Sequence, residues 1–208
     1  MFDFLHTVDW ADAWPYYIGV LLFGYLLGSI PFALIFTWLS GGGDIRRIGS
    51  GNVGATNVLR TGSRWAAAAT LICDAGKGAV AILLVRAYYN DTMAVFAGLG
   101  AFLGHVYPVW LKFKGGKGGA TALGIALALY WPVGLVAAAL WIAVAAIWRI
   151  SSLATLTAAA SAPLAMMLAG RPFFALFAFI LALLIFMTHR GNIARLLGGS
   201  EPRIGAKT

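Results

Sequence analysis

Long apolar runs, each close to the length of a membrane-crossing helix, occupy most of this sequence and constrain its fold more than any other feature. A bilayer core about 30 Å thick requires roughly 20 consecutive apolar residues in a helix. Hydrophobic residues make up 61% of the chain and charged residues only 11%, a composition foreign to soluble domains. Because lipid cannot satisfy backbone polar groups, these runs predict an all-α polytopic membrane protein. With 208 residues, we expect a single membrane domain covering 1–208.

The runs predict about seven transmembrane helices, bounded by glycine, proline and interfacial aromatic residues. Pro31 predicts a kink within the first of them. The block 120–148 is longer than one span requires, and Trp131-Pro132 near its middle predicts two short helices. The other predicted spans cover residues 16–39, 65–89, 92–110, 151–170 and 173–188.

Positive charge gathers in the loops of one predicted side. The chain carries 15 Lys plus Arg against 7 Asp plus Glu, a formal net charge of +8. In a polytopic protein such an excess is typical of cytoplasmic loops beside anionic lipid, so we do not expect nucleic acid binding. With seven spans, the N-terminus is then outside and the C-terminus cytoplasmic. The acidic residues predicted outside are Asp3, Asp9, Asp12 and Asp91.

The loop 45–64 is a polar segment between two apolar blocks, and it combines arginines with glycine, serine and asparagine. Glycines let backbone amides approach an oxyanion, and guanidinium groups bind phosphate through paired hydrogen bonds. A solvated loop whose arginines only fix the membrane orientation accounts for the same residues equally well. The candidate phosphate-site residues here are Ser50, Asn52, Asn57 and Arg60.

A second glycine and cation cluster, 112–119, contains Lys112, Lys114 and Lys117. A glycine-rich turn before a helix aims free N–H groups and a positive dipole end at an anion. The segment superficially resembles a nucleotide-binding P-loop, but Gly118 stands where Ser or Thr would hold magnesium, which argues against an NTPase. The alternative is interfacial anchoring by the lysines.

His105 near the end of the third span is a candidate general base, neutral hydrogen-bond donor or structural residue. Asp74 and Lys77 lie three residues apart on one helical face and are expected to neutralise each other. No cluster has metal-ligand spacing, so neither a metal nor another cofactor is expected. Serines occur without a nucleophile elbow, so covalent catalysis has no support. The single cysteine, Cys73, excludes an intrachain disulfide.

Several motifs together resemble the signature loops of the bacterial acyl phosphate:glycerol-3-phosphate acyltransferase family, and the resemblance spans nearly the whole chain. Gly119 and Gly191 depart from that pattern. The motifs are Gly28-Ser29-Ile30-Pro31, Ser50-Gly51-Asn52-Val53-Gly54-Ala55-Thr56-Asn57 with Arg60, Asp74 with Lys77-Gly78, Gly104-His105 with Pro108, Phe113-Lys114-Gly115-Gly116-Lys117-Gly118 with Ala120-Thr121, Arg149 with Ser151-Ser152-Leu153, and His189-Arg190 with Asn192-Ile193 and Arg195-Leu196-Leu197.

The resemblance implies transfer of a fatty acyl group from acyl phosphate to the 1-hydroxyl of glycerol 3-phosphate, without an acyl-enzyme. The family is thought to use the donor's own phosphate as the base, with His105 as the competing base here. Implied phosphate contacts are Ser50, Arg60, Lys114, Lys117, Arg149, Ser151 and Ser152. Implied glycerol phosphate contacts are Asn52, Asn57, His105, His189 and Asn192. Ser50, Arg60, His105 and Lys117 are the catalytic candidates among them.

The implied location is the bacterial cytoplasmic (inner) membrane, with the active site facing the cytoplasm among glycine-rich loops and membrane lipids. A transporter for a phosphorylated solute is the alternative function, since Asp74 and Lys77 could line a pathway. A transporter should carry polar groups on both sides, whereas these groups gather on one side. The oligomeric state and the preferred acyl length are left open by the sequence.

Overall fold

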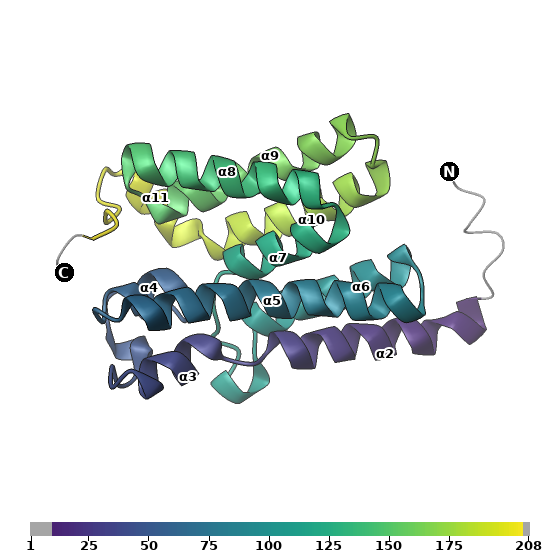
Figure 1. Cartoon of the computed structure of the whole chain (residues 1–208), viewed down its shortest axis with the longest axis horizontal. Helices are drawn as coiled ribbons and strands as arrows, with labels where there is room; N and C mark the ends of the chain where they lie inside the picture. Colours follow the sequence, from purple (N-terminus) through teal and green to yellow (C-terminus); the bar gives the residue numbers. More distant parts are fainter. Residues whose placement is uncertain (1–9, 206–208) are drawn as a thin grey trace.

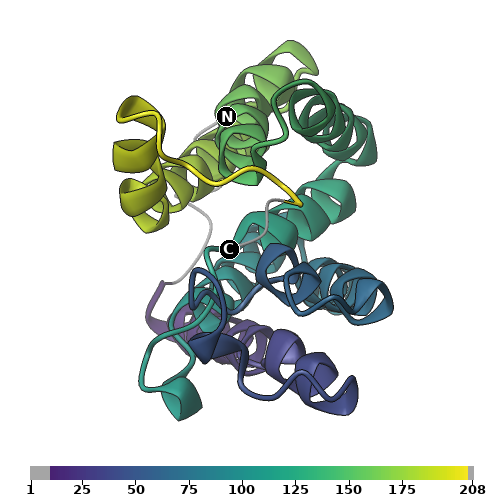
Figure 2. The same ribbon diagram turned by 90° about the vertical axis from the view of Figure 1, so that its left-hand side faces the viewer.

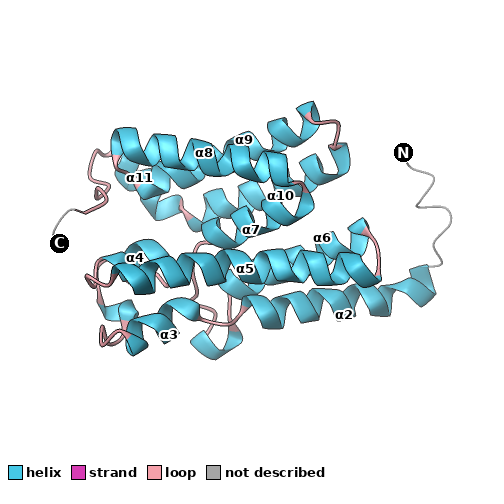
Figure 3. Ribbon diagram, in the orientation of Figure 1, coloured by secondary structure: helices cyan, strands magenta, loops and turns pink. Residues whose placement is uncertain are grey.

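The computed structural model describes residues 10–205, and within that range all regular structure is helical, which confirms the predicted all-α class (Figures 1 and 3). Asp3, Asp9 and the side chain of Asp12, predicted to lie outside, are not among the described parts. The helices are α2 (Trp10–Gly28), α3 (Phe32–Leu39), α4 (Ala55–Leu59), α5 (Arg64–Tyr88), α6 (Asp91–Val106), α7 (Gly119–Leu129), α8 (Trp131–Trp148), α9 (Ser151–Leu168), α10 (Pro172–Thr188) and α11 (Arg190–Leu197), with 3-10 turns η1 (Ile45–Arg47) and η2 (Val109–Leu111).

The described residues contain 5 helical segments long and apolar enough to cross a membrane, or up to 6 if the bent pair α10 and α11 is one span. The predicted break near Trp131 is present, but it divides 120–148 unequally. Helix α7 has 11 residues, whereas α8 has 18. At 1.5 Å per residue, α7 is about 16 Å long, roughly half of a bilayer core. The prediction of about seven transmembrane helices, two of them short helices within 120–148, is therefore not confirmed, although the break between those two is present.

The first span is broken at Pro31, as its sequence predicted. Helix α2 ends at Gly28 and α3 begins at Phe32. Such a break leaves carbonyl groups without helical partners, and in lipid each of these needs another donor. The indole Nε1 of Trp110 donates to the carbonyl of Ser29 over 2.8 Å, and Nζ of Lys77 donates to that of Ile30 over 3.0 Å. The break is thus held by side chains from two other elements.

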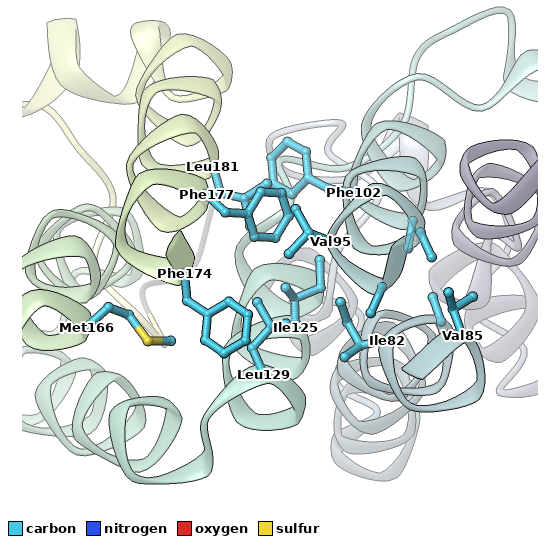
Figure 4. Packing of buried hydrophobic residues seen from close by; sticks show 14 of the residues in the cluster. Ile82, Val85, Val95, Phe102, Ile125, Leu129, Met166, Phe174, Phe177 and Leu181 are labelled. Carbon is cyan, nitrogen blue, oxygen red and sulfur yellow. The ribbon is translucent and has the colours of Figure 1, made fainter. Parts of the chain in front are cut away.

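The helices form two layers with α7 between them (Figures 1 and 2). One layer contains α2, α3, α5 and α6, and the other contains α8, α9 and α10. Figure 4 shows how α7 joins the layers, because Ile125 and Leu129 lie between Ile82 of α5 and Phe174 of α10. Burying these side chains excludes lipid and water from the centre.

Small residues let α2 and α6 pack with their backbones in contact. A Cβ atom added to Gly28 would overlap the carbonyl of Ala101, and one added to Gly104 would overlap that of Tyr25. Close approach through small residues is a common way to associate helices in membranes. This contact fixes α6, whose C-terminal end carries His105 toward the cavity described below.

Helices α4 and α11 and the end of the described chain lie at one end of the molecule, and the start of α2 lies at the other (Figure 1). The polar loop 45–64 and the C-terminal segment therefore share one end of the bundle. That this end faces the cytoplasm stays a prediction.

Candidate active site

A cavity of about 740 Å³ is lined by residues of both layers and of α7, and its lining extends to α4, α11 and the C-terminal segment. Its lining changes character along α10, from Phe177 and Leu181 to His189 at the helix end. The apolar part continues along α7 to Leu129. The cavity thus joins a polar head to an apolar tail, which suits an amphiphile better than a small polar solute.

The glycine loop before α7 forms one wall of the polar head. Its backbone is tied to α6, because the N–H of Gly116 donates to the carbonyl of His105 over 3.0 Å. A side chain at Gly116 would overlap the His105 ring, and Gly118 has φ 89°, so both positions require glycine. The loop presents Lys117, whose Nζ donates to Oδ1 of Asn192 over 2.6 Å. Partial burial lowers the pKa of Lys117, an effect that nearby Glu201 opposes.

The loop 45–64 forms another part of the polar head, and Asn57 holds this loop in shape. Its buried amide donates to the carbonyls of Ile45 and Ile48 over 3.1 and 2.9 Å. Its Oδ1 accepts from the N–H of Ser50 over 3.2 Å. Asn57 therefore orders the loop, while Ser50 and Arg60 take their places along the cavity wall.

Helix α9 and the C-terminal segment complete the polar head around Glu201. This carboxylate accepts from Ser152 Oγ over 2.6 Å, Asn192 Nδ2 over 2.5 Å and Arg195 Nε over 2.7 Å. Burial raises the pKa of Glu201, but these hydrogen bonds outweigh burial and hold it below its usual value. Sequence reasoning gave Glu201 and Arg195 no role in the site. One sequence feature could have drawn attention to Glu201, because it is the lone acidic residue after Asp91 in a basic segment of the chain.

The structure brings most of the predicted site residues together, but two of them lie elsewhere. Lys114 and Arg149 are exposed and absent from the cavity wall. Arg149 instead fastens the C-terminal segment, since its carbonyl accepts from the N–H of Ile204 over 2.6 Å and its guanidinium donates to the carbonyl of Ile204. The predicted residues that line the cavity are Ser50, Asn52, Asn57, Arg60, His105, Lys117, Ser151, Ser152, His189 and Asn192.

Asp74, Lys77 and His105 form a buried group behind the glycine loop. Lys77 Nζ lies 2.8 Å from Asp74 Oδ1, and their side chains are only 2% and 3% exposed. This ion pair confirms the predicted mutual neutralisation. His105 Nδ1 lies 3.5 Å from the same carboxylate oxygen. In residues 10–205, no group of three His, Cys, Asp or Glu side chains is arranged to hold a metal ion.

The fold and the site define a helical integral membrane protein with a cavity that has a polar head and an apolar tail. The model of the family described as "Glycerol-3-phosphate acyltransferase" matches residues 18–199. The chain belongs to this family, which confirms the resemblance read from its motifs.

Two curated relatives named glycerol-3-phosphate acyltransferase illustrate the match. One from Mesorhizobium japonicum is 55% identical, covering 91% of this chain and 97% of its own. One from Caulobacter vibrioides is 60% identical, covering 88% of this chain and 86% of its own.

Crystal structures of PlsY (YgiH), an integral membrane glycerol 3-phosphate acyltransferase, share the fold at 40% identity. The glycerol 3-phosphate form has a TM-score of 0.85 and covers 91% of this chain and 96% of its own. The lysophosphatidic acid form has a TM-score of 0.84 and covers 91% of this chain and 95% of its own.

We expect the Lys77→Met substitution to lower the stability of the folded protein by about 3–5 kcal/mol, because it leaves the Asp74 carboxylate buried without its cation. Thermal unfolding in detergent would measure the loss, and Asp74→Asn in the same chain should restore part of it. The matched control is Arg46→Met, which breaks the exposed pair with Asp44 and should leave the midpoint nearly unchanged. Equal shifts for both single variants would contradict a structural role for the buried pair.

Proposed function

We propose that this protein transfers a fatty acyl group from acyl phosphate to the 1-hydroxyl of glycerol 3-phosphate, giving lysophosphatidate and inorganic phosphate. The observation that carries the proposal is the single cavity whose polar head is built from four separate segments and whose tail is apolar. Both substrates bring a phosphate, and one brings a long alkyl chain, so each part of the cavity has a matching group. The names of the relatives support glycerol 3-phosphate as the acyl acceptor.

The polar head suits anions that must be held close together despite their repulsion. Arg60 and Lys117 supply positive charge from two different loops, and Ser50 and Asn192 supply hydrogen-bond donors. Ser152 becomes a donor when its hydroxyl turns away from Glu201. Fixed donors and cations reduce the cost of orienting two charged substrates. We assign phosphate binding to these residues. Asn57 acts by ordering the loop that carries Ser50.

In the proposed step, the hydroxyl oxygen of glycerol 3-phosphate attacks the acyl carbonyl, and the bond from the acyl carbon to the phosphate oxygen breaks. The hydroxyl proton passes to an oxygen of the departing phosphate. Acyl phosphate is already activated, so orientation and charge neutralisation suffice and no enzyme nucleophile is needed. His105 is 7% exposed and its Nδ1 lies 3.5 Å from Asp74 Oδ1, an arrangement that fits a structural residue and equally a general base oriented by a carboxylate. The substrate-assisted route therefore rests on the reactivity of the donor.

The same proposal places the protein in a bacterial cytoplasmic membrane with the polar head of the cavity facing the cytoplasm. The acyl tail would then lie at the depth of the inner leaflet, along α7 and α10. Family membership favours this enzyme over the transporter alternative.

Purified protein supplied with acyl phosphate and glycerol 3-phosphate, without metal, ATP or acyl carrier, should form lysophosphatidate and release phosphate in equal amounts. Mass spectrometry of the lipid and a phosphate assay would measure both products. Acyl-CoA in place of acyl phosphate is the control donor and should give no product. Product from acyl-CoA alone would contradict the proposed donor while leaving the acceptor in place.

Replacing Arg60 with alanine should reduce turnover by 100-fold or more, by analogy with the loss of about 10² to 10³ when one transition-state donor is removed. Arg47→Ala is the matched control, because Arg47 belongs to the same loop but is exposed and lies outside the cavity wall. Steady-state kinetics of both variants would measure the difference. Similar losses would mean that these arginines serve only membrane orientation.

His105→Ala should retain at least about 10% of the wild-type kcat, because the proposed step does not use a general base, whose removal would lower the rate by about 10²- to 10⁴-fold. Thermal unfolding and binding of both substrates would establish that the variant is folded. A folded variant that binds both substrates yet shows no turnover would identify His105 as the base instead.

A further inference from the structure

The segment 107–114, which we call the outer knob, lies outside the cavity and has no part in the proposed reaction. It contains η2 and appears in teal as a projection away from the bundle in Figures 1 and 2. Tyr107, Trp110 and Phe113 are 43%, 55% and 59% exposed. Lys112 and Lys114 are exposed as well. The knob therefore combines large aromatic surfaces with two cations.

The outer knob is held in a defined conformation. The indole Nε1 of Trp110 donates to the carbonyl of Ser29 over 2.8 Å. The hydroxyl of Tyr25 donates to the carbonyl of Tyr107 over 2.8 Å. Lys112 and Phe113 have φ values of 53° and 61°, a left-handed conformation that residues other than glycine rarely adopt. A strained backbone persists only where surrounding contacts hold it, and such places are often binding sites.

The cations of the knob have no partner within the described chain. Neither the Lys112 nor the Lys114 ammonium forms a hydrogen bond or ion pair with a described residue, and the knob contains no acidic side chain. Some basic side chains are paired, as Arg86 is with Asp91 and Arg195 with Glu201, whereas Arg47, Arg64, Arg190 and Arg203 resemble the knob lysines in having no such partner among the described residues. What distinguishes the knob is that its two cations stand beside exposed aromatic rings. The knob thus presents unneutralised positive charge beside apolar surface.

We propose that the outer knob binds the headgroup of an anionic phospholipid, with the lysines on its phosphate and the aromatic rings against its glycerol and upper chains. Residues 107–111 form the end of the candidate span Asp91–Leu111, and the knob projects from the side of the bundle, so we expect lipid headgroups beside it. Tyrosine and tryptophan favour the level of the headgroups, and lysine stems can lie along apolar surface while their charges reach phosphate. Anionic headgroups complement the charge, whereas zwitterionic ones do so poorly.

The test uses the full-length protein in nanodiscs containing either brominated phosphatidylglycerol or brominated phosphatidylcholine at equal mole fraction. Bromine quenches nearby tryptophan emission, and the difference between wild type and Trp110→Phe isolates the signal of Trp110. We expect roughly fivefold or greater enrichment of the anionic lipid beside Trp110. The Lys112→Gln/Lys114→Gln variant should be quenched equally by both lipids, with an unchanged melting temperature showing that it is folded.

The control is Arg47→Gln/Arg190→Gln, which removes the same charge from two exposed positions outside the cavity wall. It should leave the preference of Trp110 for the anionic lipid intact. Equal quenching by both lipids in the wild type, or an equal loss in the control variant, would overturn the proposal. Quenching by a brominated lysophosphatidate but not by phosphatidylglycerol would instead indicate a product site. The experiment reads tryptophan quenching and not catalysis, so its outcome does not depend on whether the proposed acyl donor is correct.

Discussion

The buried ion pair between Asp74 and Lys77 connects the parts of the structure on which the site depends. A charge without a partner at membrane depth is costly, so this pair constrains the elements around it. Lys77 also donates to Ile30 at the break between α2 and α3, while Asp74 contacts His105 on α6. The carbonyl of His105 in turn holds the glycine loop that presents Lys117. A polar contact inside the bundle thus helps to set the position of a cavity-wall cation.

Separate loops become one polar surface because each is stiffened locally before it meets the others. Asn57 orders the first loop, the glycine loop is tied to α6, and Glu201 joins α9, α11 and the C-terminal segment. The hydrogen bond between Thr56 and Ser151 then links the first loop to α9. Donors held in this way need little reorganisation around an anion, which is the property that a phosphate-binding transferase requires.

Much of the candidate site could be predicted because phosphate chemistry restricts residue types in short loops. Ser50, Arg60 and Lys117 were predicted from their glycine-rich surroundings and the family resemblance, and they line the cavity, while their binding of phosphate stays a prediction. Lys114 and Arg149 met the same criteria yet lie outside the cavity, since composition does not say which way a loop turns. The left-handed turn at Lys112 and Phe113 accompanies the exposed position of Lys114. Glu201 was missed because a carboxylate is not expected in a site for anions.

The sequence by itself determined the membrane class, the all-helical fold, the break at Pro31 and the family, because hydrophobic run length and local motifs are properties of neighbouring residues. Only the tertiary structure decided that α7 lies between the two layers, that Asn57 orders a loop, and that Glu201 joins three donors. These features depend on contacts between segments far apart in the chain. The length of helix α7 differs in this respect, because Gly118 and Pro132 set its ends locally, and only its place between the two layers required the tertiary structure.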